Sequence, residues 1–179
     1  MKGILKTVAL AALCMASLNT FATTDNTPEE AYQDITRSLA DLHPITFQAP
    51  AEKYALLVFI DNQCSYCSDV VKNVDKYTDA GLTLSFLTVA PNAIRDSVIE
   101  DMGRVWCSAD KVKSLKNAMA GFLPGNDTSP ACSELVARQS ALAERLGINV
   151  TPFMVVIEPQ SRAIVGSQPP DAILATLNK

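Results

Sequence analysis

The stretch YALLVFIDNQCSYCSDVV, residues 54–71, places an apolar run directly before two cysteines that are separated by two residues. The run at 54–61 has the length of a strand, and its continuous apolar character indicates burial on both faces of a sheet. The segment at 64–80 carries apolar residues at helical spacing. We therefore expect Cys64 and Cys67 to lie at the junction between a buried strand and the helix that follows it.

Outward from this stretch, the chain alternates between predicted strands and helices. These further elements are a strand at 82–90, helical segments at about 95–119 and 129–146, strands at 153–158 and 163–167, and a C-terminal helix opened by Pro169 and Pro170. The early strand–helix–strand order predicts parallel pairing, whereas the late strand–turn–strand order predicts an antiparallel hairpin. The sequence thus predicts an α/β fold with a mixed central sheet, helices on both faces and a helical insert between its halves.

The N-terminus has the layout of a secretory signal peptide, because Lys2 and Lys6 precede an apolar core followed by small residues. The apolar core is shorter than the roughly 20 residues needed to cross a bilayer. We expect 1–22 to be a signal peptide, 23–50 a helix and linker, and 51–179 the folded domain. Loss of the two lysines makes the net charge of −4 more negative, and a mildly acidic domain without a basic stripe argues against nucleic acid as a partner.

Residues 27–44 predict a helix, with Thr27 as its cap and Glu30 placed as in a capping box. Its apolar residues recur at spacings of three and four: Tyr32, Ile35, Leu39 and Leu42. This stripe is expected to pack against its own domain, with a short self-association seam as the alternative. His43, the only histidine, stands beside a proline at the helix exit and is expected to be a solvated loop residue rather than a metal ligand.

A helix that begins near Cys64 places its sulfur among unpaired backbone N–H groups, which stabilise the thiolate that attacks disulfides. Cys67 follows one turn later on the same face, where it can attack a mixed disulfide and release the substrate. The alternative is a static disulfide at a helix start. A bond that closes so short a loop restricts the unfolded chain little, so stability alone is a weak reason for the pair.

The other cysteines bear on metal chemistry. A structural zinc site usually takes two closely spaced ligand pairs, but Cys107 and Cys132 are isolated and no histidine lies near them. A c-type haem is excluded because Ser68, not histidine, follows Cys67. Cleavage of the signal peptide would remove Cys14 and leave four cysteines. An even count in an exported protein favours a structural disulfide between Cys107 and Cys132, worth about 3 kcal/mol. A second redox pair and a zinc site built from all four cysteines stay open as alternatives.

Pro152 stands directly before the predicted strand at 153–158. Cis X-Pro bonds are a minority of about 5–6% in folded proteins, so the Thr151–Pro152 bond taken alone is expected to be trans.

The order of these features resembles the thioredoxin superfamily, and within it the catalytic domain of the DsbC/DsbG family of bacterial periplasmic disulfide isomerases. The motifs that carry the resemblance, within 45–179, are FIDNQCSYC (59–67), RVWCSADK (104–111), NAMAG (117–121), Cys132, LGINVTPFMVV (146–156) and GSQPP (166–170). A second pair at Cys107 and Cys132 is not a general thioredoxin feature. Val58 stands six residues before Cys64, where thioredoxin and DsbA-like proteins usually carry a buried acid and the isomerases do not.

The resemblance implies roles for the catalytic residues. Cys64 would be the nucleophile and Cys67 the resolving cysteine, and Cys107 and Cys132 would form the structural disulfide. Electrons would move through Cys64 and Cys67 themselves, so no cofactor and no metal are expected.

The resemblance also implies a substrate site. Thr151 would precede a cis Pro152 packed against the active-site sulfurs, which overrides the base rate for X-Pro bonds. The exposed backbone of that turn would pair with an extended substrate strand. Tyr66, between the two cysteines, matches the family as well.

Two departures limit what carries over. Ser65 stands where the isomerase typically has glycine and DsbG has proline, so the redox potential does not transfer. Between residue 22 and the first predicted strand there is room for the linker helix alone, so the family's dimerisation domain is expected to be absent. A monomer with weak isomerase activity and retained reductase chemistry is expected, with oxidase behaviour as an alternative.

The expected partners follow from the same resemblance. They are exported proteins with disulfides or thiols, and a membrane redox partner that is DsbD-like or DsbB-like, in the periplasm. A different class also stays open, namely a periplasmic metal-binding protein or metallochaperone that uses the Cys64 and Cys67 thiolates.

Overall fold

The computed structural model describes residues 27–158 and 162–179, so the predicted signal peptide lies outside the described residues. The elements, in chain order, are α1 (Pro28–Leu42), β1 (Ile45–Phe47), β2 (Tyr54–Ile60), α2 (Ser65–Lys72), α3 (Val74–Asp79), β3 (Leu82–Thr88), the short 3-10 helix η1 (Asn92–Ile94), α4 (Arg95–Cys107), α5 (Lys111–Met119), α6 (Pro130–Arg145), β4 (Phe153–Glu158), β5 (Arg162–Val165) and α7 (Pro170–Leu177).

The strands form one mixed sheet in the order β1-β3-β2-β4-β5. β2 pairs with β3 in parallel, while β4 lies antiparallel to β2 and forms a hairpin with β5. This confirms the predicted mixed sheet. Strand β1 was not predicted, since 45–47 falls in the segment assigned to the helix and linker. It has only three residues, and pairing with β3 places Ile45 opposite Phe86 at the sheet edge.

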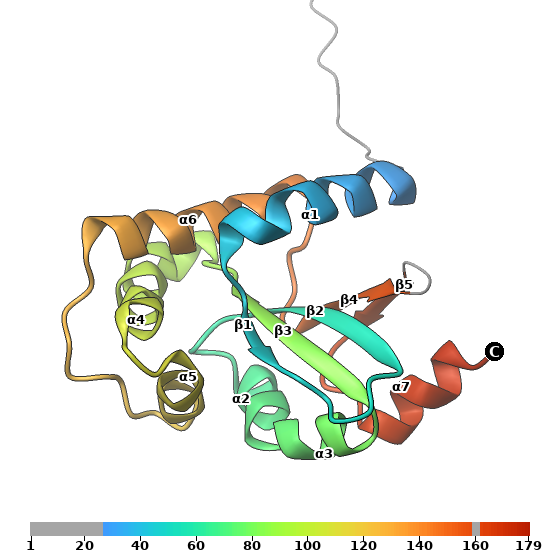
Figure 1. The fold of residues 1–179 in the computed structure, drawn as a ribbon. Coiled ribbons are helices and arrows are strands. Elements are labelled where there is room, and N and C mark those ends of the chain that lie inside the picture. Colours follow the sequence, from blue (N-terminus) through green and yellow to red (C-terminus); the bar gives the residue numbers. More distant parts are fainter. Residues whose placement is uncertain (1–26, 159–161) are drawn as a thin grey trace, which may run out of the picture.

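The sheet is the middle layer of the fold, with α1 and α6 on one face and α2, α3 and α7 on the other (Figure 1). Alternate side chains of β2 point to opposite faces of the sheet. Leu57 and Phe59 pack with α1 and α6, whereas Leu56, Val58 and Ile60 join the larger core on the other side. All five are fully buried, and burying such a side chain is worth about 1.5–3 kcal/mol. This double burial explains the continuous apolar run that the sequence shows.

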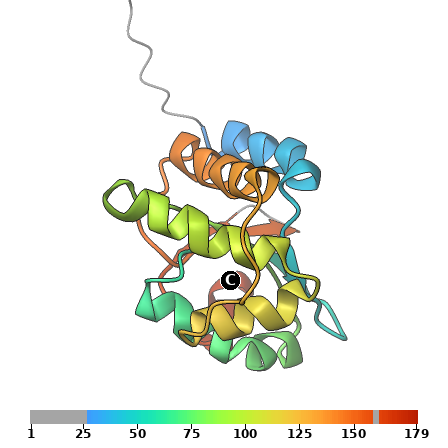
Figure 2. The same cartoon turned by 90° about the vertical axis from the view of Figure 1, so that its left-hand side faces the viewer.

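The helical insert α4–α6 covers one end of the sheet, and in Figure 2 α4 crosses between α6 and α5. The single helical segment expected at about 95–119 is two helices, because Asp110 caps α5 by accepting a hydrogen bond from the Lys113 N–H at 3.0 Å. The segment expected at 64–80 is likewise divided, at Asn73 between α2 and α3.

Helix α1 begins with the predicted capping box. The Thr27 hydroxyl accepts a hydrogen bond from the Glu30 N–H at 3.3 Å, and the Glu30 carboxylate accepts one from the Thr27 N–H at 2.9 Å. Ile35 and Leu42 are buried against the core that includes residues of α6, so the apolar stripe packs on its own domain. His43 ends the helix exposed, with a positive φ of 44°. None of the helices in the described part of the chain is both long and apolar enough to traverse a lipid bilayer.

Candidate active site

The two closely spaced cysteines lie where β2 ends and α2 begins, as the sequence predicts. Cys64 is the N-cap of α2, and its sulfur accepts a hydrogen bond from the Cys67 N–H at 3.3 Å. Both are free thiols, Cys64 partly exposed and Cys67 buried. An unpaired N–H at a helix start stabilises a negative charge on the group that it faces. Substrate can therefore reach one sulfur, and the other is shielded directly behind it.

Burial determines the protonation state of the Cys67 sulfur. It raises the pKa of the Cys67 thiol well above its ordinary value, and donation of the thiol to the neighbouring Cys64 sulfur acts in the same direction. The Asp61 backbone and the Thr151 side chain act on this pKa in the opposite direction, but less strongly. Cys67 is thus held as a neutral thiol in the reduced protein.

The Thr151–Pro152 peptide bond is cis, as the family resemblance implied and against the base rate for X-Pro bonds. The Thr151 carbonyl oxygen lies 3.5 Å from the Cys64 sulfur. The fold therefore brings the turn before β4 against the start of α2, although the two are far apart in sequence.

Asp61 is the site residue that the sequence analysis missed. It follows β2 directly, and only 4% of its surface is exposed. One carboxylate oxygen accepts a hydrogen bond from the Thr151 hydroxyl at 2.8 Å, and the other accepts one from the Gln63 N–H at 2.9 Å. The expectation of no buried acid rested on position 58, where Val58 is indeed buried in the sheet. An acid that ends an apolar strand just before a cysteine was the available signal.

The loop between β2 and α2 is also fastened to the helical insert. The Asn62 side-chain amide donates to the Asp101 carboxylate of α4 at 2.8 Å. One turn away on α4, the Ser97 hydroxyl accepts a hydrogen bond from the Gln63 side chain at 2.9 Å. Helix α4 therefore helps to set the backbone that presents Cys64.

Asp61, Cys64 and Cys67 place one potential ligand atom each within 4.8 Å of one another, the one such group of three found within 27–158 and 162–179. A structural zinc site takes four ligands. Cys107 and Cys132 are bonded to each other, so the zinc site built from all four cysteines is wrong. His43, whose backbone carbonyl accepts from Trp106, does not belong to the group.

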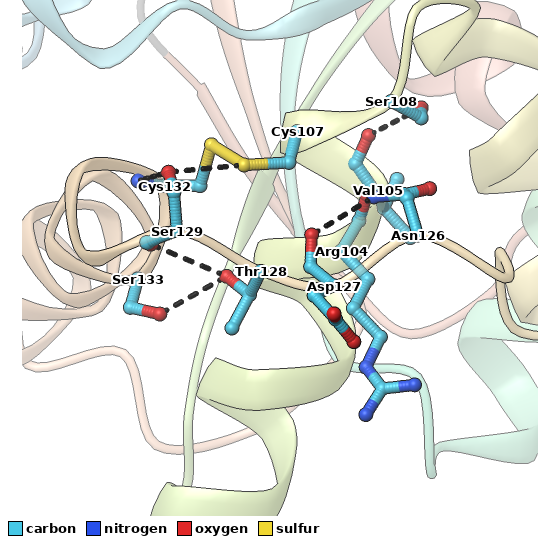
Figure 3. Close-up of a disulfide and its surroundings, with 10 residues drawn as sticks. All are labelled: Arg104, Val105, Cys107, Ser108, Asn126, Asp127, Thr128, Ser129, Cys132 and Ser133. Atoms are coloured by element: carbon cyan, nitrogen blue, oxygen red, sulfur yellow. Dashed lines mark hydrogen bonds between the residues drawn. A yellow bond between two sulfur atoms is a disulfide. The ribbon is translucent and has the colours of Figure 1, made fainter.

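The Cys107–Cys132 disulfide joins the last residue of α4 to the first turn of α6 (Figure 3). The Ser129 hydroxyl lies 3.2 Å from the Cys107 sulfur and accepts a hydrogen bond from the Cys132 N–H at 3.3 Å. Ser129 thereby caps α6 and packs against the bond at once. The disulfide lies within the insert and shares no residue with the Cys64 group.

Two apolar side chains are exposed on the segments that flank Cys64. Tyr66, in the first turn of α2, is 64% exposed, and Val150, directly before the cis turn, is 46% exposed. Exposed apolar side chains beside a reactive group suit contact with another polypeptide.

Comparison with known proteins matches this arrangement. The family model of the thioredoxin-like domain matches residues 43–179, so the chain belongs to the thioredoxin-like family. Within this class it is similar to the thiol:disulfide interchange proteins DsbC of Salmonella typhimurium, at 31% identity over 136 residues, and of Dickeya dadantii, at 30% over 135. Both alignments cover 75% of this chain, which spans about half the length of these relatives, 55% and 54% respectively.

A solved structure shares the fold as well. The disulfide interchange protein from Neisseria gonorrhoeae superposes with a TM-score of 0.62 at 24% sequence identity, covering 75% of this chain and 93% of that one. At this identity the likeness bears on the fold alone. It agrees with the thioredoxin-like fold that the family model indicates.

Proposed function

We propose that the protein is a thiol–disulfide oxidoreductase that acts on disulfides of exported proteins through Cys64 and Cys67, as an isomerase or reductase. The observation that carries the proposal is the asymmetry of the pair. The Cys64 sulfur is partly exposed at a helix N-cap. Cys67 is a buried neutral thiol, and its backbone N–H donates a hydrogen bond to the Cys64 sulfur. The similarity to DsbC proteins supports the same reaction.

The reaction runs in two exchanges. The Cys64 thiolate attacks a substrate disulfide, a Cys64–substrate bond forms, and the second substrate sulfur leaves as a thiolate. The Cys67 thiol then gives up its proton and attacks the Cys64 sulfur. This closes a Cys64–Cys67 disulfide and releases the reduced substrate. In isomerisation the substrate's own thiol performs the second attack instead, and Cys64 is returned unchanged.

The turn at Thr151 and Pro152 is the proposed substrate-binding element. Its backbone lies beside the Cys64 sulfur, where an extended substrate segment can pair with it. A cavity with a volume of about 430 Å³ opens beside Thr151, lined in part by Ile148 and Asn149. It has room for a side chain next to the substrate cysteine, and the exposed Tyr66, between the two cysteines, offers a further apolar contact.

Partners and location follow from the same proposal. We expect a periplasmic protein, exported by residues 1–22 and reset by a DsbD-like or DsbB-like membrane protein. The α1 stripe is already packed inside its own domain, which favours a monomer with weak isomerase and retained reductase activity. A dimer in light scattering, or refolding of scrambled ribonuclease at the rate of a full-length dimeric isomerase, would contradict this part.

A glutathione titration read by alkylation and mass spectrometry tests the function. We expect one labile pair, Cys64 and Cys67, with a potential between roughly −120 and −230 mV, and a Cys107–Cys132 bond that resists reduction to below about −300 mV. A Cys64/Cys67 potential near −120 mV would favour an oxidase, and one near −230 mV would favour a reductase.

The same sample tests the second candidate function, a metal carrier. That candidate rests on the proximity of Asp61 to the two thiols. Stoichiometric zinc or copper in the purified protein, with both thiols protected from alkylation until a chelator is added, would replace the oxidoreductase proposal.

A further inference from the structure

We propose that Glu144, near the C-terminal end of α6, selects substrates that carry a lysine or arginine close to the reactive cysteine. The inference rests on the proposed function and names the substrate class of the same site. That class is extended segments with a cationic side chain within two residues of the disulfide. The binding site for this side chain is the cavity of about 430 Å³ beside Thr151.

The cavity lies where a bound substrate would pass. Its lining includes Thr151, whose backbone carbonyl is 3.5 Å from the Cys64 sulfur, and Asn149 of the same segment. Successive residues of an extended chain are about 3.3 Å apart. A substrate cysteine held at Cys64 therefore places its nearest neighbours in sequence over this lining.

The walls of the cavity suit the hydrocarbon part of a long side chain. Val89, Ala90 and Ile148 line it and are buried, and Pro91 adds further apolar surface. Lysine and arginine bury their apolar stems against such surfaces while the charged head stays in water. The head then lies at Glu144, whose side chain is 53% exposed.

The charge around the cavity favours a cation. Glu144 is the one charged side chain among the described residues that line it. Arg95 pairs with one Glu144 oxygen at 2.5 Å from outside the lining, and a carboxylate has acceptor positions for a second donor. The buried carboxylate of Asp61, which accepts from the Thr151 hydroxyl, adds a negative charge behind the wall. Two carboxylates against one guanidinium leave the surroundings of the cavity net negative.

A general attraction between an acidic protein and basic substrates must be separated from a contact at Glu144. The chain has a net charge of −4, so any basic peptide is attracted to it. That attraction depends little on where a lysine stands in a short peptide. A contact with one carboxylate requires the lysine at a particular distance from the cysteine, so the test moves a single lysine along the peptide.

The probe is a short neutral peptide whose single cysteine is bonded to nitrothiobenzoate. Reduced protein is mixed with it in a stopped-flow instrument. The Cys64 thiolate bonds to the peptide sulfur and nitrothiobenzoate leaves with the electron pair, so its absorbance reports the first exchange. A lysine is placed in turn at each of the four positions within two residues of the cysteine, and each peptide is compared with its glutamine counterpart. Division by the rate with mercaptoethanol removes the intrinsic reactivity of each disulfide.

We expect lysine at one of these positions to raise the second-order rate constant roughly threefold to fivefold over glutamine, near the upper end for an exposed ion pair. The gain should lie in the apparent affinity for the peptide, with the limiting rate nearly unchanged. Glutamate at the same position should react more slowly than glutamine. Raising the salt from about 50 mM to about 500 mM should remove most of the lysine preference in the unaltered protein, because salt screens exposed charges.

Four variants assign the preference to its residue. Glu144→Gln should abolish the lysine preference, and Glu144→Lys should reverse it in favour of glutamate. Arg95→Gln removes the competing cation and should increase it. Glu134→Gln is the matched control and should keep the full preference, because Glu134 also lies on α6 and pairs with an arginine, Arg138, but does not line the cavity.

Several results would overturn the proposal and leave the proposed function standing. They are an equal rate for lysine and glutamine at every position, the same lysine preference at all four positions, and an unchanged preference in Glu144→Gln. A native preference for glutamate would assign the cavity to Arg95 and would overturn it as well. A native protein that releases no nitrothiobenzoate from any of the peptides would instead contradict the proposed function itself.

Discussion

The two cysteine pairs of this protein differ in almost every respect that controls sulfur chemistry. Cys64 and Cys67 are three positions apart, reduced, and placed at the start of a helix beside a buried carboxylate. Cys107 and Cys132 are 25 positions apart and bonded to each other inside the insert, beside the serine that caps α6. A bond that closes a long loop restricts the unfolded chain, whereas a bond across two residues restricts it little. One pair is therefore suited to stability and the other to exchange.

The largest expected effects come from removing each cysteine pair in turn and measuring activity and stability. Cys64→Ser should reduce insulin reductase activity to background and leave the free energy of unfolding within about 0.5 kcal/mol. The double variant Cys107→Ala with Cys132→Ala should lose about 3 kcal/mol in urea unfolding and retain reductase activity below its melting temperature. If the double variant instead loses activity while still folded, the two pairs are chemically linked and the division of labour is wrong.

The next effect concerns the packing that supports the structural pair. A Cβ on Gly103 of α4 would lie 2.3 Å from the Thr128 hydroxyl oxygen, in the segment leading to α6. We expect Gly103→Ala to cost about 1–3 kcal/mol of stability because that segment must move. Thermal unfolding measures the cost.

Gly125→Ala is the matched control, since no atom lies within 4 Å of its ideal Cβ. It should change stability by no more than about 0.5 kcal/mol. A Gly103→Ala protein as stable as this control would mean that the insert yields more readily than its packing suggests.

A third effect distinguishes the buried thiol from the bonded pair through pH. In unfolded protein Cys67 ionises near its ordinary pKa of 9.0, and burial raises that pKa in the folded state. Its contribution to stability is therefore complete below about pH 9 and is lost as pH rises further. The reduced protein should lose about 1.4 kcal/mol per pH unit above this value.

Urea unfolding of the reduced protein at pH 8 and pH 10, compared with Cys67→Ala, measures this loss. The variant keeps Cys64 and every other titrating group, so the difference between the two proteins isolates Cys67. Parallel stability curves would show that the buried thiol ionises as easily as a free one.

The smallest effect is expected at Tyr66, which is mostly exposed. Tyr66→Ala should leave stability within about 0.5 kcal/mol and raise the KM for a disulfide-bonded peptide about threefold, with kcat nearly unchanged. A fall in kcat alone would mean that Tyr66 acts on the sulfurs rather than on substrate binding.

Sequence patterns anticipated those parts of the fold in which the pattern is long. The apolar run of β2, the β4–β5 hairpin and the capping box of α1 were all predictable, because each rests on burial or on local hydrogen bonds. β1 was not, since three residues with Ile45 and Phe47 buried leave too short a pattern. The breaks at Asn73 and Asp110 were missed because apolar periodicity continues across them.

The candidate site was predictable as far as local sequence reaches. The spacing of Cys64 and Cys67 indicated a helix start, and the resemblance supplied the cis bond at Pro152. Asp61 was missed because its importance depends on Thr151, 90 residues later in the chain. Only folding brings the Thr151 hydroxyl to the Asp61 carboxylate.

The full burial of Cys67 has a consequence for oxidative damage. Hydroperoxides react with exposed thiolates, so an oxidant that reaches this site meets Cys64 first. The sulfenic acid that forms there lies against the Cys67 thiol, and the two condense to a disulfide with loss of water. That product is reversible, whereas sulfinic and sulfonic acids are not. The same shielding that sets the order of exchange thus leaves the pair in a state that any thiol reductant can repair.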